Sequence, residues 1–453
     1  MANGRPLTSF EATMETLTRH QGNYNVLIAS RLRGALDLPQ LQQAIAHLQA
    51  RHPQLQGCIM GNPETECRFM YGQAEAIPSK VIPLAASGDR DAAITQELTT
   101  PFPSDRFLMR CILLSPPKSL PTSDSTHYLL TTLHHAICDG ASAVQLQTEL
   151  LELCAQSLGQ SPQWATPTPP FDSIDDHKPA SPKGVLSAIK GFLKLLVQAM
   201  FLWYCLEKQT KARLPPVPET SLPGQVYFHT QRVLGPERTQ NLVSLCRQNH
   251  TTVQGALCAA MMVAVKPWVV SEDSDGKALK MGCASSVDLR RRCDPPIDPK
   301  PLGLFISFSL SFHRLSRGLS GDRPTADKTF WRLAREVRTQ TSRTLAVQLP
   351  FKTLSTFQQS INHNLKHPND EPMPVQVTNL GRIEVPTTVG KISVEETSFF
   401  GSIAAFRRTI LISVATFNGH MTINFHTTSP ALSQKILDSF ANQVIDLLAA
   451  ETR

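Results

Sequence analysis

The chain reads LHHAICDG at residues 133–140. Apolar residues run through 128–133 just before the two histidines, which predicts a strand. After Gly140, apolar residues recur at helical spacing to about residue 157, which predicts a helix. The motif therefore lies at a strand-to-helix junction, where loops gather functional groups.

Histidine is the side chain whose ordinary pKa best suits proton transfer near neutrality, so His134 and His135 are candidates for acid–base chemistry. Structural interpretations stay open for each motif residue. A histidine can be a hydrogen-bonded core residue, Asp139 can cap the following helix, and Gly140 can serve a tight turn. A metal site is not expected, because adjacent strand residues point to opposite faces and no third ligand is near.

The rest of the chain alternates strand and helix patterns in two halves of similar size. In the first half, Asp37 and Pro39 begin an amphipathic helix over 38–48. In the second half, Asn418 and Gly419 join two alternating segments, which predicts a type I′ hairpin over 410–417 and 420–426. The remaining expected elements are strands at 24–34, 107–114, 225–233 and 304–310, and helices at 236–249, at 252–265 and after Ser433.

A chain of 453 residues is longer than one core usually supports, so two lobes are expected. We predict an N-terminal lobe over 1–160 that carries the histidine motif, a proline-rich linker over 161–224, and a C-terminal lobe over 225–453. The linker contains an apolar helix at 185–206. Lys190 and Lys194 lie within it, which disfavours a membrane span and favours a helix packed on the protein or a peripheral membrane contact.

Composition adds mild constraints. The formal charge is 44 − 37 = +7, which permits an acidic partner without selecting one. No basic-aromatic cluster supports nucleic-acid binding. The ten cysteines form no C-x-x-C pair, which predicts buried, reduced thiols. Residues 1–10 lack a secretory pattern, so a cytoplasmic protein is expected.

The H-H-x-x-x-D-G pattern resembles that of the condensation-domain and acyltransferase superfamily. This superfamily includes condensation domains of nonribosomal peptide synthesis, stand-alone alcohol acyltransferases and mycobacterial polyketide-associated acyltransferases. Further segments resemble family segments in the same order along essentially the whole chain: 5–11, 41–55, 252–260, 287–305 and 377–381. The resemblance implies an α/β (α+β) fold similar to chloramphenicol acetyltransferase, with mixed, largely antiparallel sheets and a channel between two lobes.

The resemblance also implies roles for individual residues. His135 matches the general base, which deprotonates the acceptor without a covalent acyl-enzyme. Asp139 matches a residue that pairs with an arginine, here Arg290. His134 matches a position that shapes the catalytic loop, and backbone N–H groups near Gly140 are candidates for holding the oxyanion. The segment containing Asn379 and Gly381 is expected to line the substrate channel.

The implied reaction moves an acyl group from an acyl-CoA or acyl-carrier-protein thioester to an alcohol of a lipid or polyketide. The thioester is a co-substrate, and no bound cofactor is expected. The D-F-G-W-G motif of plant members is absent near 399–402, and no carrier or adenylation domain accompanies the motif, which favours a free-standing O-acyltransferase. Two alternatives stay open: a condensation enzyme that forms an amide, and a catalytically silent scaffold that binds a carrier protein.

Overall fold

The computed structural model describes residues 4–21, 24–63, 65–86, 88–116, 125–156, 167–168, 173–179, 212–215, 226–271, 278–298, 300–316, 323–367, 369, 373–401, 408–428 and 432–449. The apolar segment predicted at 185–206 lies outside them, as does Cys205. Among the described helices, none has the length and apolar character that crossing a bilayer requires.

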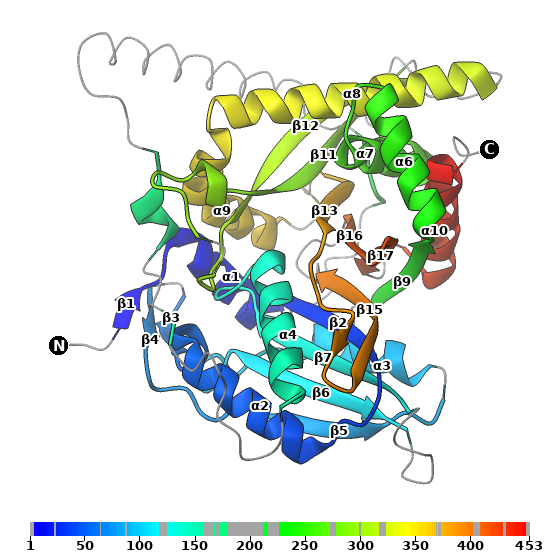
Figure 1. Ribbon diagram of the computed structural model, residues 1–453. Coiled ribbons are helices and arrows are strands. Elements are labelled where there is room, and N and C mark those ends of the chain that lie inside the picture. Colours follow the sequence, from blue (N-terminus) through cyan, green and yellow to red (C-terminus); the bar gives the residue numbers. More distant parts are fainter. Residues whose placement is uncertain are drawn as a thin grey trace.

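Two six-stranded sheets form the framework of the two lobes (Figure 1). The first has the order β14-β15-β2-β7-β6-β5 and the second the order β12-β11-β13-β16-β17-β9. The pairs β5–β6, β11–β13 and β13–β16 are parallel and the others antiparallel, which confirms the expected mixed, largely antiparallel architecture. The strands are β2 (Asn25–Arg33), β5 (Ser79–Pro83), β6 (Met109–Ser115), β7 (Thr126–His134), β9 (Tyr227–Leu234), β11 (Ala278–Asp288), β12 (Ile306–Ser316), β13 (Val375–Arg382), β14 (Thr388–Val389), β15 (Ile392–Gly401), β16 (Ile410–Phe417) and β17 (His420–Thr428).

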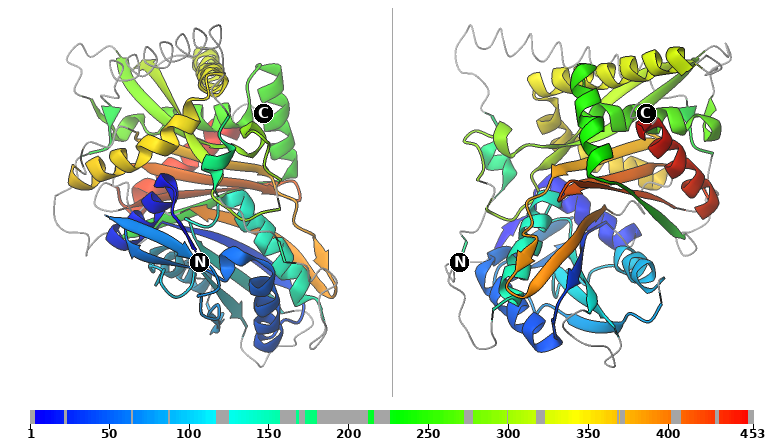
Figure 2. Two further views of the ribbon diagram at one scale, coloured as in Figure 1. Left: turned by 90° about the vertical axis from the view of Figure 1, so that its left-hand side faces the viewer. Right: turned by 45° about the vertical axis from the view of Figure 1, so that its right-hand side comes forward.

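Helices flank both sheets (Figures 1 and 2). With the first sheet lie α1 (Ser9–Gln21), α2 (Leu38–Arg51), α3 (Asp89–Thr99) and α4 (Gly140–Cys154); with the second lie α6 (Pro236–Gln248), α7 (Val253–Ala264), α8 (Arg323–Ala346), α9 (Leu349–Lys366) and α10 (Gln434–Ala449). A three-stranded sheet of β1 (Gly4–Pro6), β4 (Glu66–Met70) and β3 (Cys58–Asn62) flanks the first lobe, and β8 (Ala212–Arg213) pairs with β10 (Val270–Ser271).

Local sequence signals explain where several elements begin and turn. The side chain of Asp37 accepts from the backbone N–H of Gln40, and the side chain of Gln40 accepts from the N–H of Asp37, forming a capping box on α2. Asn418 and Gly419 have φ values of 45° and 81°, the positive values that a type I′ turn needs, so the predicted hairpin is confirmed. Ser433 accepts from the N–H of Ile436 at the start of α10.

Strands β14 and β15 come from the second half of the chain but join the sheet formed by the first half. Strand β15 pairs with β2, from Ser393 opposite Arg33 to Gly401 opposite Val26, and β14 continues this edge. Residues 388–401 therefore belong to the first sheet, although they fall within the segment 225–453 that was predicted as the second lobe. Neither strand was predicted from the sequence, because nothing local marks β15 as a strand that pairs with residues 360 or more positions away.

A continuous core spans the junction of the two lobes. Phe10 of α1 packs against Phe308 of β12 and Phe357 of α9, with ring centroids 6.3 and 5.2 Å away. The nine cysteines that the structure describes are free and buried, as predicted. The two lobes therefore meet across packed apolar side chains, and the histidine motif lies where they meet.

Candidate active site

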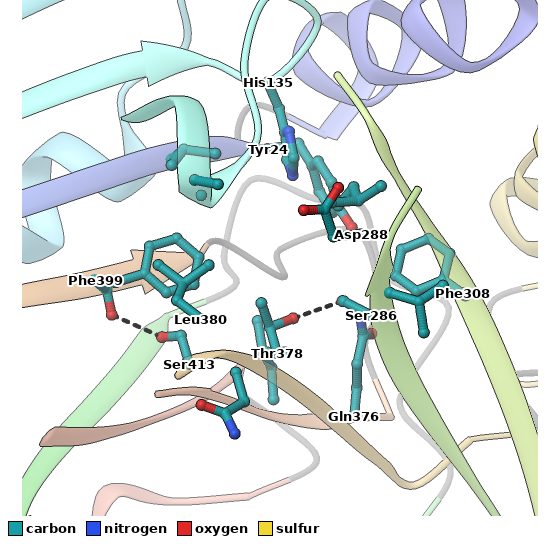
Figure 3. Close-up of a pocket in the computed structure, with 18 of the residues that line it drawn as sticks. Tyr24, His135, Ser286, Asp288, Phe308, Gln376, Thr378, Leu380, Phe399 and Ser413 are labelled. Atoms are coloured by element: carbon teal, nitrogen blue, oxygen red, sulfur yellow. Dashed lines mark hydrogen bonds between the residues drawn. The ribbon is translucent and has the colours of Figure 1, made fainter. Parts of the chain in front are cut away.

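The histidine motif occupies the junction of β7 and α4. Strand β7 ends at His134, and α4 begins at Gly140 with Asp139 as its N-cap. Nδ1 of His135 lies 2.7 Å from the carbonyl oxygen of Cys138. A carbonyl oxygen only accepts, so Nδ1 carries the proton and Nε2 keeps its lone pair. The ring stacks on Tyr24, with centroids 5.2 Å apart and 17° between planes, and points into the pocket (Figure 3).

The surroundings favour the neutral form of His135. Burial lowers its pKa below the ordinary 6.5, and the hydrogen bond to Cys138 and the charge of Asp139 oppose that effect only in part. A neutral imidazole with a free Nε2 at a pocket can accept a proton.

Asp139 holds the motif to the second lobe. It is fully buried, and its Oδ1 accepts from the guanidinium of Arg290 and from the N–H of Ser142, each at 2.9 Å. Its Oδ2 accepts from the N–H of Phe305 at 3.0 Å. Burial alone would raise the pKa of Asp139, but Arg290 and these N–H groups hold it below its usual value. The carboxylate of Asp139 thus both caps α4 and forms the expected ion pair with Arg290.

Arg290 is itself held from several sides. It contacts Asp288 at 3.2 Å and donates to the hydroxyl of Ser142 at 2.9 Å, and its guanidinium lies 4.4 Å from the ring centroid of Phe305. The ion pair therefore locks the N-terminus of α4 onto the segment that follows β11.

His134 faces away from the pocket. Its fully buried ring lies with Nε2 3.0 Å from the carboxylate of Glu15 of α1. Its Nδ1 accepts from the N–H of Ala136 at 3.1 Å. Burial raises the pKa of Glu15, but the contacts with His134 and Arg19 lower it overall. His134 thus contacts the loop and α1, whereas His135 contacts the pocket.

Both lobes line the pocket, which has a volume of about 150 Å³ and lies where the channel was expected. Gly140 lines it, and a Cβ there would lie 2.8 Å from Leu380 and 3.1 Å from Phe399. Since its φ is not positive, Gly140 is required for space and not for a turn. Asn379 also lines the pocket and accepts from the N–H of Gly381. Gly381 has a φ of +70° and is not among the lining residues.

Several lining residues were missed by the sequence analysis. Tyr24 and Asp288 lie at the His135 end of the pocket, and four polar residues lie farther from His135 (Figure 3): Ser286, Gln376, Thr378 and Ser413. Asp288 stands within the quoted family segment 287–305 and could have been singled out there. The four polar residues come from three strands that meet only in the folded sheet, and of the four only Thr378 stands within a quoted family segment, 377–381. In the described parts of the chain, no group of three histidine, cysteine or acidic side chains could hold a metal ion.

Comparisons with known families match most of the chain. The condensation-domain family matches residues 12–275, and the phthiocerol/phthiodiolone dimycocerosyl transferase C-terminus family matches residues 224–426. Isonitrile lipopeptide synthase of Mycobacterium tuberculosis is 28% identical over 166 residues, which are 34% of this chain and 6% of that protein. Surfactin synthase subunit 1 of Bacillus subtilis is 29% identical over 140 residues, 31% of this chain and 4% of that protein. The chain thus spans only a small part of these curated relatives.

Solved structures share the fold over nearly the full length. Trichothecene 15-O-acetyltransferase of Fusarium sporotrichioides matches with a TM-score of 0.73 and 15% identity, covering 99% of this chain and 95% of that one. Polyketide synthase associated protein 5 of Mycobacterium tuberculosis matches with a TM-score of 0.64 and 18% identity, covering 99% and 98%. At such identities the likeness establishes the two-lobed fold.

Proposed function

Because the chain belongs to the condensation-domain family and is a transferase, we propose that it moves an acyl group from a thioester to an alcohol, with His135 as the general base. The observation that carries this proposal is the tautomer of His135. Its Nδ1 is occupied by the Cys138 carbonyl, and its Nε2 faces a pocket shared by both lobes.

In the proposed reaction, Nε2 of His135 removes the acceptor hydroxyl proton as the oxygen attacks the thioester carbonyl. The tetrahedral intermediate then collapses, the C–S bond breaks, and His135 returns the proton to the leaving thiolate. The oxyanion would be held by backbone N–H groups at the start of α4, since Gly140 and Ala141 line the pocket and a helix N-terminus favours negative charge. His134, Asp139 and Arg290 act as positioning residues.

The proposed donor is an acyl-CoA or an acyl group on a carrier protein, because one curated relative is a lipopeptide synthase and the fold neighbours include condensation domains. The proposed acceptor is an alcohol, because the trichothecene 15-O-acetyltransferase that shares this fold acetylates an oxygen. A cytoplasmic location and a peripheral membrane contact through 185–206 remain parts of this proposal.

The test is thiol release from acyl-CoA and acyl-carrier-protein donors with a panel of alcohols and amines, for wild type, His135→Ala and the surface control His420→Ala. We expect acceptor-dependent release that falls about 10²- to 10⁴-fold in His135→Ala and stays unchanged in the control. Equal release by wild type and His135→Ala would remove His135 as the base. Release with amines alone would establish the amide-forming alternative, and no release with any donor would favour the silent scaffold.

A further inference from the structure

A row of polar side chains crosses the inner face of the second sheet. Strand register places Thr378 of β13 opposite Ser413 of β16, and Ser413 opposite Asn424 of β17. Ser286 of β11 extends the row, since its hydroxyl lies 2.7 Å from that of Thr378. Gln376 lies two residues before Thr378 and therefore on the same face. We call Ser286, Gln376, Thr378 and Ser413, which all line the pocket, the polar wall.

Hydrogen bonds fix the orientation of the Ser413 hydroxyl. It donates to the carbonyl oxygen of Phe399 at 3.0 Å, and it lies 2.7 Å from Nε2 of His426. Nδ1 of His426 lies 2.5 Å from the hydroxyl of Tyr227. The one-way chain that satisfies every donor runs from Tyr227 O–H to His426 Nδ1, from His426 Nε2–H to Ser413, and from Ser413 O–H to Phe399. Ser413 is left with a lone pair and no proton to give.

Gln376 has no such partners. Gln376 as a whole is only 8% exposed, yet its side-chain amide makes no hydrogen bond within the part of the chain that the structure describes. The amide atoms are not enclosed by protein but reach the open space of the pocket, where water or a ligand can supply their hydrogen bonds. The amide lies near Ser286 and Thr378 on the pocket side of the sheet (Figure 3).

Apolar side chains also line the pocket, and the space is small. Leu380, Phe399 and Phe308 line it opposite or beside the polar wall. A volume of about 150 Å³ holds one benzene-sized group, which is about six heavy atoms. A long alkyl chain would have to extend out of this space and would place no hydrogen-bonding group beside the Gln376 amide.

We propose that the polar wall binds a hydroxyl group of the substrate, so that the group seated beside His135 is a short, hydroxyl-bearing chain and Gln376 determines this specificity. The substrate hydroxyl donates to the Gln376 carbonyl or to Ser413 and accepts from the Gln376 amide N–H. This inference rests on the proposed function. The hydroxyl belongs either to the acyl group or to the acceptor, and both present the same chemistry to the wall.

The test compares matched substrate pairs: butanoyl-CoA with 3-hydroxybutanoyl-CoA as donors, and butan-1-ol with butane-1,3-diol as acceptors. Wild type should favour the hydroxylated member of one pair by about 10- to 100-fold in kcat/KM, because the deoxy analogue displaces water from the Gln376 amide without replacing its hydrogen bonds. The pair that shows the preference identifies the source of the hydroxyl. Gln376→Met, which removes the amide at similar volume, should abolish that preference without lowering the melting temperature.

Gln340→Met is the matched control. Gln340 is held by two hydrogen bonds with the backbone of Phe312, at 2.9 and 2.8 Å, and is not among the pocket-lining residues. Its substitution should lower the melting temperature and leave the substrate preference intact. A preference that survives in Gln376→Met, or a wild type without preference in either pair, overturns the inference.

Binding measured by calorimetry separates this inference from the proposed function. The ligands are thioether analogues of the two CoA donors and the two free alcohols, so that the readout needs no turnover. Hydroxyl-selective binding without thiol release would contradict the proposed acyl transfer and support the polar wall. Thiol release without selectivity in binding or turnover would support the acyl transfer and overturn the polar wall.

Discussion

At the scale of the residue, the tautomer and burial of His135 set the expected pH dependence. The base works only when neutral, and burial lowers its pKa below 6.5. Activity should therefore stay constant as pH falls toward 6.5 and decline only below it, through the lowered pKa. The measurement is kcat/KM against pH with a non-titrating donor and acceptor. An acid limb with its midpoint at or above 6.5 would contradict the assigned environment of His135.

The Asp139–Arg290 pair predicts a loss of stability as well as of rate. Removing Arg290 leaves the fully buried carboxylate of Asp139 without its cation, and breaking such a pair typically costs about 3–5 kcal/mol. Arg290→Met should lower the free energy of unfolding in urea by about this amount, together with a lower kcat.

The exposed pair of Arg106 and Glu75 provides the control for that experiment. Its atoms lie 2.7 Å apart with both side chains about half exposed, so solvent screens the interaction. Arg106→Met should leave the free energy of unfolding nearly unchanged. An equally small effect of Arg290→Met would show that Asp139 is stabilised by the N–H groups of Ser142 and Phe305 alone.

At the scale of the element, α4 approaches β13 and β15 so closely at Gly140 that a larger residue there would push against the pocket wall. Gly140→Ala removes a poor helix former, yet places a methyl group 2.8 Å from Leu380 and 3.1 Å from Phe399. We expect a near-native melting temperature and a marked loss of kcat. Leu380→Ala combined with Gly140→Ala should recover part of the activity, because it makes room for the methyl group. Full activity of Gly140→Ala would show that the close approach of residue 140 to Leu380 and Phe399 does not limit catalysis.

Elements with strong local signals could be predicted from the sequence. Helix α2 begins where Asp37 and Pro39 indicated, and β16 and β17 meet at the predicted Asn418–Gly419 turn. The first lobe held unpredicted elements as well, including α1 and the small sheet of β1, β4 and β3. These segments are short or weakly periodic, and their packing against distant residues decides their conformation.

At the scale of the whole molecule, the histidine motif could be located from sequence, but the surface around it could not. His135, Asp139 and Gly140 are contiguous and follow a recognisable strand. The polar wall is assembled from β11, β13 and β16, whose neighbours are set by the sheet order. Likewise Tyr24 meets His135 because β2 and β7 pair, placing Asn25 opposite His134. The pairing of strands that are distant in sequence therefore brings to the pocket most of the residues that the motif does not contain.

The crossing of β15 makes the two lobes interdependent for folding. A fragment of residues 1–160, the predicted first lobe, would lose β15 and expose the edge of β2. It would also lose the contacts of Phe10 with Phe308 and Phe357. Exposed edges and uncovered apolar surface promote association, so we expect the fragment to aggregate or to unfold without a cooperative transition.

Co-expression of 1–160 with 161–453 supplies the missing strand and is the control. The two fragments should co-purify and show one unfolding transition, monitored by circular dichroism and by tryptophan fluorescence, because the core is continuous across the lobes. A cooperative transition of 1–160 alone would mean that the remaining pairing and packing of its strands and helices suffice without β15. Independent transitions of the co-expressed fragments would mean that the lobes touch without sharing stability, and the pocket between them could then open without unfolding either one.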